Sequence, residues 1–153
     1  MAKLLIKIKN YIFYSVIMLL VAACAQEAAP PEDTAVANVI IEIPAAELYQ
    51  RIETDTAPLI IDVRSSDEFA AGHLPGALNV AHSEFIDTPT ESVALLPTAK
   101  DAEIVVHCVS GKRAKIAMDV ISSAGYTNVS HLIGDFSGWQ AAGYPIEQDN
   151  LPN

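Results

Sequence analysis

Short apolar runs alternate with segments of helical periodicity along most of the chain. Residues 39–43, 59–63 and 104–106 are largely apolar and rich in β-branched side chains, the pattern of strands buried on both faces of a sheet. Segments with apolar residues three or four positions apart begin at Pro44 and at Lys112, after the first and third of these runs. This alternation predicts βα units and a parallel sheet.

Two further short strands are expected at residues 77–80 and 128–132, which makes five strands in all. Ser65 and Glu68 have the spacing of a capping box, in which each side chain bonds the backbone N–H of the other, so a helix is expected through residues 69–71. Gly72 is the expected end of that helix. Other helical segments are expected at residues 84–86, 92–96 and 135–142, with breaks at Pro89 and Pro97.

The helix that begins at Lys112 is expected to continue to Ala124, with Gly125 as its end. Its apolar side chains fall at helical spacing. The predicted buried face holds Ile116, Val120 and Ala124, with Ala117 and Ile121 beside them.

Cys108 lies at the turn between the third of the apolar runs and the helix that follows it. In an open α/β sheet, such a turn lies at the carboxyl ends of the strands, where ligands bind and the first N–H groups of the helix are free. The helix dipole, Lys112, Arg113 and Lys115 favour a thiolate, and no residue from 104 to 118 is acidic. The turn therefore favours a reactive Cys108 over a buried, inert one.

The first 23 residues have the pattern of a targeting segment. Lys3, Lys7 and Lys9 give a basic start, residues 11–22 are apolar apart from Ser15, and small residues precede Cys24. This pattern resembles a bacterial lipoprotein signal with its lipobox, which implies cleavage before Cys24 and acylation of that cysteine. An uncleaved anchor helix is the alternative, but the uncharged run is shorter than the roughly 20 residues that a membrane span needs.

Residues 24–37 are small, polar and proline-bearing, and are expected to form a flexible tether between the lipid on Cys24 and a domain at residues 38–149. The resemblance to a lipoprotein implies a protein anchored to a membrane and facing the periplasm. Ala25 favours the outer membrane, because lipoproteins retained in the inner membrane often have Asp after the acylated cysteine.

The chain is acidic, with a formal net charge of −10. Removal of residues 1–23 takes away three lysines and no acidic residue, which leaves 6 basic and 19 acidic residues and a charge of −13. A polyanionic partner such as a nucleic acid is therefore not expected. Acylation of Cys24 also leaves Cys108 without a cysteine partner, because the chain has only these two cysteines.

Four segments in order resemble the rhodanese-like domains. They are Asp62-Val63-Arg64 with Glu68-Phe69, Gly72-His73-Leu74-Pro75-Gly76-Ala77 with Asn79, Cys108-Val109-Ser110-Gly111-Lys112-Arg113, and Leu132-Ile133-Gly134 through Trp139 to Gly143-Tyr144-Pro145. The resemblance implies an α/β fold with a central parallel sheet of about five strands flanked by helices. It also implies a thiosulfate sulfurtransferase that works without a cofactor.

In such an enzyme Cys108 would take the outer sulfur of thiosulfate, release sulfite and hold a persulfide for cyanide or a thiol. The resemblance places the donor among the backbone N–H groups of the loop and the cations that follow it. The implied substrate-binding residues are Val109, Ser110, Gly111, Lys112 and Arg113. Arg113 has a structural alternative, in which its guanidinium bonds carbonyls of the loop. No metal site is expected, because the histidines are scattered and none pairs with a cysteine at ligand spacing.

Two other functions are weighed against sulfur transfer. One is a binding module that keeps the fold without catalysis, which the intact loop disfavours. The other is a phosphatase or arsenate reductase, whose loops resemble a version with five residues between the cysteine and the arginine. Here four residues separate Cys108 from Arg113.

The remaining positions of the resemblance are interpreted as structural. His73 and Asn79 are expected to fix a turn and a strand edge by hydrogen bonds, His107 to pack in the core, and Trp139 likewise. Gly134-Asp135 departs from the paired glycines often found in the family. Asp135 could therefore add a carboxylate close to the mouth of the site.

Overall fold

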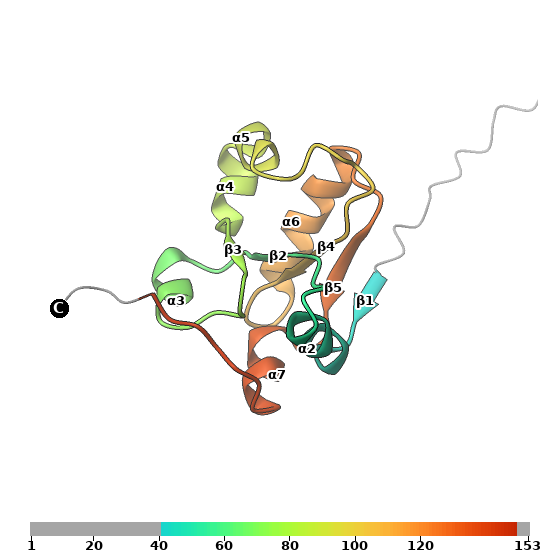
Figure 1. Cartoon of the computed structure of the whole chain (residues 1–153). Helices are drawn as coiled ribbons and strands as arrows, with labels where there is room; N and C mark the ends of the chain where they lie inside the picture. The colour runs from blue at the N-terminus through green and yellow to red at the C-terminus, as the bar shows by residue number, and fades with distance from the viewer. Residues whose placement is uncertain (1–40, 150–153) are drawn as a thin grey trace, which may run out of the picture. The chain divides into compact units, whose positions relative to one another are not determined.

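A parallel five-stranded sheet forms the centre of the part of the chain that the structure describes, residues 41–149 (Figure 1). In this computed structural model the strand order is β1-β5-β4-β2-β3, and all neighbouring strands are parallel. The strands are β1 (Ile41–Ile43), β2 (Leu59–Asp62), β3 (Leu78–Asn79), β4 (Ile104–His107) and β5 (Val129–Leu132). The predicted fold class is therefore confirmed.

Helices connect the strands and cover both faces of the sheet (Figure 1). Successive residues of a strand point to opposite faces. Ile60 and Val105 thus contribute to one apolar cluster, with residues of α2 and α7, whereas Ile61 contributes to the other, with residues of α4 and α6. The helices are α2 (Ala45–Glu53), α3 (Ser66–Ala70), α4 (His82–Asp87), α5 (Pro89–Ala94), α6 (Lys112–Ser123) and α7 (Asp135–Ala141).

The capping box predicted at the start of α3 is present. The Ser65 hydroxyl accepts a hydrogen bond from the Glu68 N–H at 3.3 Å, and the Glu68 carboxylate accepts one from the Ser65 N–H at 3.0 Å. Two orphan donors of the helix start are thereby satisfied. This local bonding explains why so short a helix forms at the predicted position.

The helical break expected at Pro89 is present. The helix α4 ends at Asp87, and Pro89 is the first residue of α5, where its missing N–H costs no intrahelical bond. Another expectation about a helix is wrong. Ile116 was expected on the buried face of α6, but it is 40% exposed. The buried stripe of α6 instead follows the i, i+3, i+4, i+7 spacing of Ala114, Ala117, Met118 and Ile121.

A buried ion pair closes the carboxyl end of β2. The carboxylate of Asp62 accepts hydrogen bonds from both the backbone and the guanidinium of Arg64, and Arg64 also donates to the Gly72 carbonyl at 2.7 Å. The guanidinium lies over the Phe136 ring at 3.7 Å from its centroid, and Asn79 donates to the carbonyls of Asp62 and Arg64. The loops around β2 are therefore joined beside the end of β4. Asn79 fixes the strand edge as predicted.

The predicted signal segment, the tether and Cys24 lie outside the described residues. Within residues 41–149, no helix combines the length and the apolar character that crossing a membrane requires.

Replacement of Arg64 by Met should destabilise the fold by about 3–5 kcal/mol, because the Asp62 carboxylate would stay buried without its cation. Arg51→Met is the matched control, since Arg51 pairs with Glu103 on the surface and such pairs contribute about 1 kcal/mol or less. Urea unfolding measures both changes. A smaller loss for Arg64→Met than for Arg51→Met would contradict the importance of the buried pair.

Candidate active site

Cys108 occupies the loop between β4 and α6, as predicted. Its Sγ accepts a hydrogen bond from the backbone N–H of Gly111 at 3.2 Å. Gly111 is the N-cap of α6, so the sulfur faces the positive end of the helix dipole. The loop therefore provides the anion-stabilising environment that was predicted from the turn.

The Cys108 residue is only 1% exposed. Val109, Gly111 and Arg113 are half-buried around it, and Ser110 and Lys112 are exposed. The structure thus places all five predicted substrate-binding residues in one loop and first helical turn, with the thiol at its base. Reactive cysteines are usually partly exposed, whereas this thiol is covered by the residues of its own loop.

Gly111 has a conformation and a position that a larger residue would not fit. Its φ is +91°, in the left-handed region that residues with a Cβ avoid. A Cβ there would lie 3.3 Å from the Asp135 Oδ2 and 3.4 Å from the His131 ring. The loop therefore closes directly over these two side chains.

Arg113 and Glu68 form a bidentate ion pair across the loop. Arg113 Nη1 donates to one carboxylate oxygen of Glu68 at 2.6 Å, and Nη2 donates to the other at 2.9 Å. This pairing is the main cause that lowers the pKa of Glu68 to about 2. It also raises the pKa of Arg113, with a smaller contribution from the nearby Cys108 sulfur. The guanidinium is thus held in place beside the sulfur.

The second role of Glu68 was missed in the sequence. Its capping bonds to Ser65 already explained a Glu at this position. The partner is 45 residues away along the chain, and only the packing of α3 against the loop brings the two side chains together. Arg113 bonds a carboxylate rather than the loop carbonyls proposed as its structural alternative.

The other two cations near the loop are exposed to solvent. Lys112 is exposed, and Lys115 pairs with Asp119 one turn further along α6 at 3.6 Å. Both remain at the positive end of α6 but contribute a solvated charge. Arg113 is therefore the least exposed of the three cations, and Glu68 holds its guanidinium.

Asp135 lies beneath the loop. Its Oδ1 accepts a hydrogen bond from the Cys108 N–H at 2.8 Å, and its Oδ2 lies 3.1 Å from Nε2 of His131. Asp135 is 3% exposed, so it is not at the mouth of the site, where a carboxylate was expected. Burial raises the pKa of Asp135, but the bonds to His131 and to the Cys108 N–H outweigh it and leave the pKa lowered.

His107 is fully buried at the end of β4. Burial is the main cause that lowers its pKa, although the Asp62 carboxylate 3.8 Å away opposes this. Nδ1 lies 3.3 Å from the Cys108 carbonyl, and Nε2 has no hydrogen-bond partner among the described residues. These contacts fit the predicted core histidine rather than a base. Trp139 is also in the core, as predicted.

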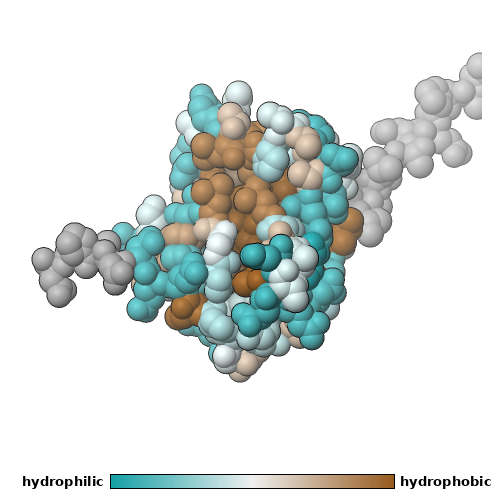
Figure 2. Space-filling view, viewed as in Figure 1, coloured by the Kyte–Doolittle hydropathy of each residue, from teal (hydrophilic) through white to brown (hydrophobic). Residues whose placement is uncertain are grey.

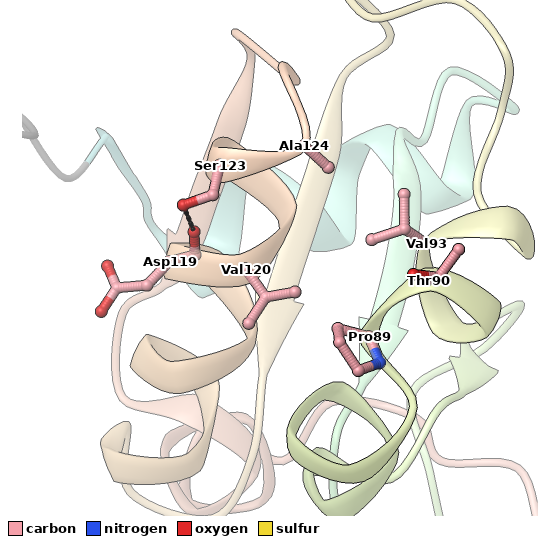
Figure 3. Close-up of a pocket in the computed structure, with 7 residues that line it drawn as sticks. All are labelled: Pro89, Thr90, Val93, Asp119, Val120, Ser123 and Ala124. Atoms are coloured by element: carbon pink, nitrogen blue, oxygen red, sulfur yellow. Dashed lines mark hydrogen bonds between the residues drawn. The ribbon is translucent and has the colours of Figure 1, made fainter.

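A second cavity of the described domain lies away from the cysteine. A groove of about 510 Å³ runs between α5 and the C-terminal half of α6, lined by Pro89, Thr90, Val93, Asp119, Val120, Ser123 and Ala124. Figure 3 shows Val93 and Val120 on opposite walls, and Figure 2 shows apolar surface over this region. Cys108 precedes the N-terminal end of the 12-residue helix α6, so the groove lies at the other end of the helix.

A smaller cavity of about 160 Å³ borders the active loop. Glu42, Gly111, Lys115, Met118 and His131 line it. Within residues 41–149, no group of three His, Cys, Asp or Glu side chains is arranged to hold a metal ion.

The Glu68–Arg113 pair should stabilise the fold at neutral pH and contribute less in acid. The folded pKa of Glu68 is lowered from 4.5 to about 2, so this stability is present above pH 4.5 and is lost as the pH falls toward 2. Because the Glu68 side chain is 36% exposed, the effect should be about 1 kcal/mol or less. Urea unfolding should show that Glu68→Gln lowers the free energy of unfolding less near pH 3 than near pH 6.

Arg113→Gln provides the control for that measurement. In the Arg113→Gln protein, the loss of unfolding free energy caused by Glu68→Gln should depend less on pH. Only the bonds between Glu68 and Ser65 then remain to be lost. An equal cost of Glu68→Gln at both pH values in the otherwise unchanged protein would show that the pair does not stabilise the fold.

Comparisons with known proteins agree with this geometry. A family model for the Rhodanese-like domain matches residues 44–142. Thiosulfate sulfurtransferase GlpE of Actinobacillus succinogenes is 31% identical over 109 residues, which span 69% of this chain and 89% of that protein. The human thiosulfate:glutathione sulfurtransferase is 36% identical over 88 residues, which span 52% of this chain and 76% of that protein.

The structural comparison leads to the same family. The crystal structure of a rhodanese-related protein from Thermoplasma volcanium matches with a TM-score of 0.58 and 28% sequence identity, over 70% of this chain and 97% of that one. The matched relatives include several named sulfurtransferases, which supports an enzyme of that type. The chain belongs to the family of rhodanese-like domains.

Proposed function

We propose that the protein transfers sulfane sulfur from an anionic donor such as thiosulfate to a thiophilic acceptor, with Cys108 as the carrier. In the first step the Cys108 thiolate attacks the outer sulfur of thiosulfate. The new Cys–S bond forms as the S–S bond of the donor breaks, and sulfite leaves with the bonding electron pair. A persulfide anion remains on Cys108, which makes this covalent catalysis in two half-reactions.

The observation that carries this proposal is the hydrogen bond from the Gly111 N–H to Sγ at the N-terminus of α6. A hydrogen-bond donor aimed at the sulfur stabilises negative charge on both the attacking thiolate and the persulfide that replaces it. Arg113, fixed by Glu68 beside the sulfur, is suited to the sulfonate-like oxygens of the donor. Val109, Ser110 and Lys112 complete the proposed donor site.

In the second half-reaction an acceptor removes the outer sulfur. Cyanide would leave as thiocyanate, and a thiolate would leave as its own persulfide, and in both cases the Cys108 thiolate is restored. The name of the human relative, thiosulfate:glutathione sulfurtransferase, supports a thiol as one acceptor class. The proposed cycle needs no metal or organic cofactor.

We propose in addition that the domain, residues 38–149, is held at the periplasmic side of a membrane by lipid on Cys24, through the tether at residues 24–37. The support is the sequence of the first 24 residues alone. Small anions and thiols would reach such a domain from the periplasm.

Replacement of Cys108 by Ser should abolish sulfite release from thiosulfate, because a serine hydroxyl does not carry sulfane sulfur. Cys24→Ser is the matched control and should keep the activity, since Cys24 is outside the proposed site. Sulfite release with cyanide as acceptor measures both, and circular dichroism checks that both variants fold. Equal turnover by Cys108→Ser and the unchanged protein would refute the assignment. Inactivity of the unchanged protein with thiosulfate would instead favour a binding module.

Mass spectrometry of protein isolated from a bacterial membrane fraction tests the anchor. An acylated N-terminus at Cys24 is expected, and Cys24→Ser should prevent the modification and release the protein from the membrane. Recovery of a chain that still carries residues 1–23 would show that the segment is not a lipoprotein signal.

A further inference from the structure

Asp135 combines two features that are unfavourable unless something compensates for them. Its φ is +53°, in the left-handed region that residues other than glycine seldom adopt, and its carboxylate is buried. Removing a carboxylate from water costs free energy unless it is paired or hydrogen-bonded. Its contacts must therefore compensate for both costs.

Those contacts hold the backbone of the nucleophile at two points. Asp135 accepts a hydrogen bond from the Cys108 N–H at 2.8 Å, and the next residue, Phe136, donates its N–H to the Cys108 carbonyl at 3.0 Å. The other carboxylate oxygen of Asp135 would be the first atom met by a Cβ on Gly111. The start of α7 thus holds the backbone of Cys108 and lies directly beneath Gly111.

His131 on β5 completes this arrangement. Its Nε2 lies 3.1 Å from Oδ2 of Asp135, and this contact is the main cause that raises the pKa of His131 above 6.5. Glu42 on β1 lies 3.9 Å from Nδ1 and raises the pKa further, while burial opposes the shift. On the other sides, Lys115 of α6 lines the same small cavity as His131, and His107 of β4 lies near Asp135.

We propose that His131 and Asp135 are positioning residues that form a proton-linked brace beneath the Cys108 loop. The brace holds the Cys108 backbone through Asp135, and its net charge changes when His131 gains or loses a proton. With a proton on His131, the pair is an imidazolium and a carboxylate with no net charge, and Asp135 is fixed by a charge-assisted bond. When His131 loses that proton, the uncompensated negative charge of Asp135 remains beneath the loop whose N–H groups would bind the anionic donor. The inference rests on the proposed sulfur transfer at Cys108, and it adds two residues that would control the affinity for the donor.

The expected sign follows from the charges. As pH rises through the titration of His131, the net charge of the pair changes from zero to −1, so thiosulfate should bind less well. The KM for thiosulfate in the sulfite-releasing half-reaction should rise about 3- to 10-fold across this range, at the electrostatic strength of a part-buried charge. The rate at saturating thiosulfate should change less than the KM.

Three variants separate this effect from a merely structural one. His131→Gln should hold the KM for thiosulfate at its high-pH value at every pH, and so remove the step, which is the rise of KM with pH. Asp135→Asn keeps an oxygen for the Cys108 N–H and tolerates the left-handed φ, so it should move the step to lower pH, because His131 loses its main proton-stabilising partner. His82→Gln, a histidine change at the start of α4, should keep the step.

Nuclear magnetic resonance of the same proteins gives a readout that does not depend on sulfur transfer. The Cys108 amide signal should shift with pH at the midpoint measured for the His131 ring, and this midpoint should fall in Asp135→Asn. Two results would overturn the inference. One is a Cys108 amide signal that does not shift at the His131 midpoint, and the other is a rise of KM with pH that persists in His131→Gln. If the unchanged protein releases no sulfite but its Cys108 amide signal shifts with the His131 titration, the proposed sulfur transfer is refuted. The coupling of His131 and Asp135 to the Cys108 loop is then still supported.

Discussion

The connection between β4 and α6 is the constraint on which the site depends. β4 ends at His107 and α6 begins at Lys112, so four residues carry the chain from the sheet edge to the helix start. In that space the backbone curls around the Cys108 sulfur, which accepts a hydrogen bond from the Gly111 N–H. Gly111 makes the curl possible, because its left-handed φ and the atoms below it exclude a Cβ.

The strands on either side of β4 supply the supports of this loop. From β2 come Asp62 and Arg64, a buried ion pair that joins the neighbouring loops. From β5 and the turn after it come His131 and Asp135. Asp135 accepts a hydrogen bond from the Cys108 N–H, and His131 contacts the other carboxylate oxygen of Asp135. The parallel arrangement brings all of these groups to the carboxyl edge of the sheet, where binding sites of α/β folds lie. Position in the sheet thus determines which side chains surround the Cys108 loop.

The sequence predicts the local part of this picture and misses the long-range part. The β-branched runs, the capping box at Ser65 and the turn at Cys108 depend on near neighbours, and the structure has them where they were expected. The pairing of Glu68 with Arg113 and the position of Asp135 beneath the loop depend on packing between elements far apart in the chain. No periodicity or spacing encodes those contacts, and the departure at Gly134-Asp135 was the one available signal. The exposure of Ile116 shows the same limit, because spacing alone did not fix which side of α6 faces the sheet.

The most direct test of the account is the intact mass of the full chain before and after exposure to thiosulfate, with Cys108→Ser as the control. A covalent sulfur carrier predicts a gain of one sulfur atom, about 32 Da, that is absent in the control and disappears when cyanide or a thiol is added. No gain in mass, or the same gain in Cys108→Ser, would contradict the assignment of Cys108 as the carrier.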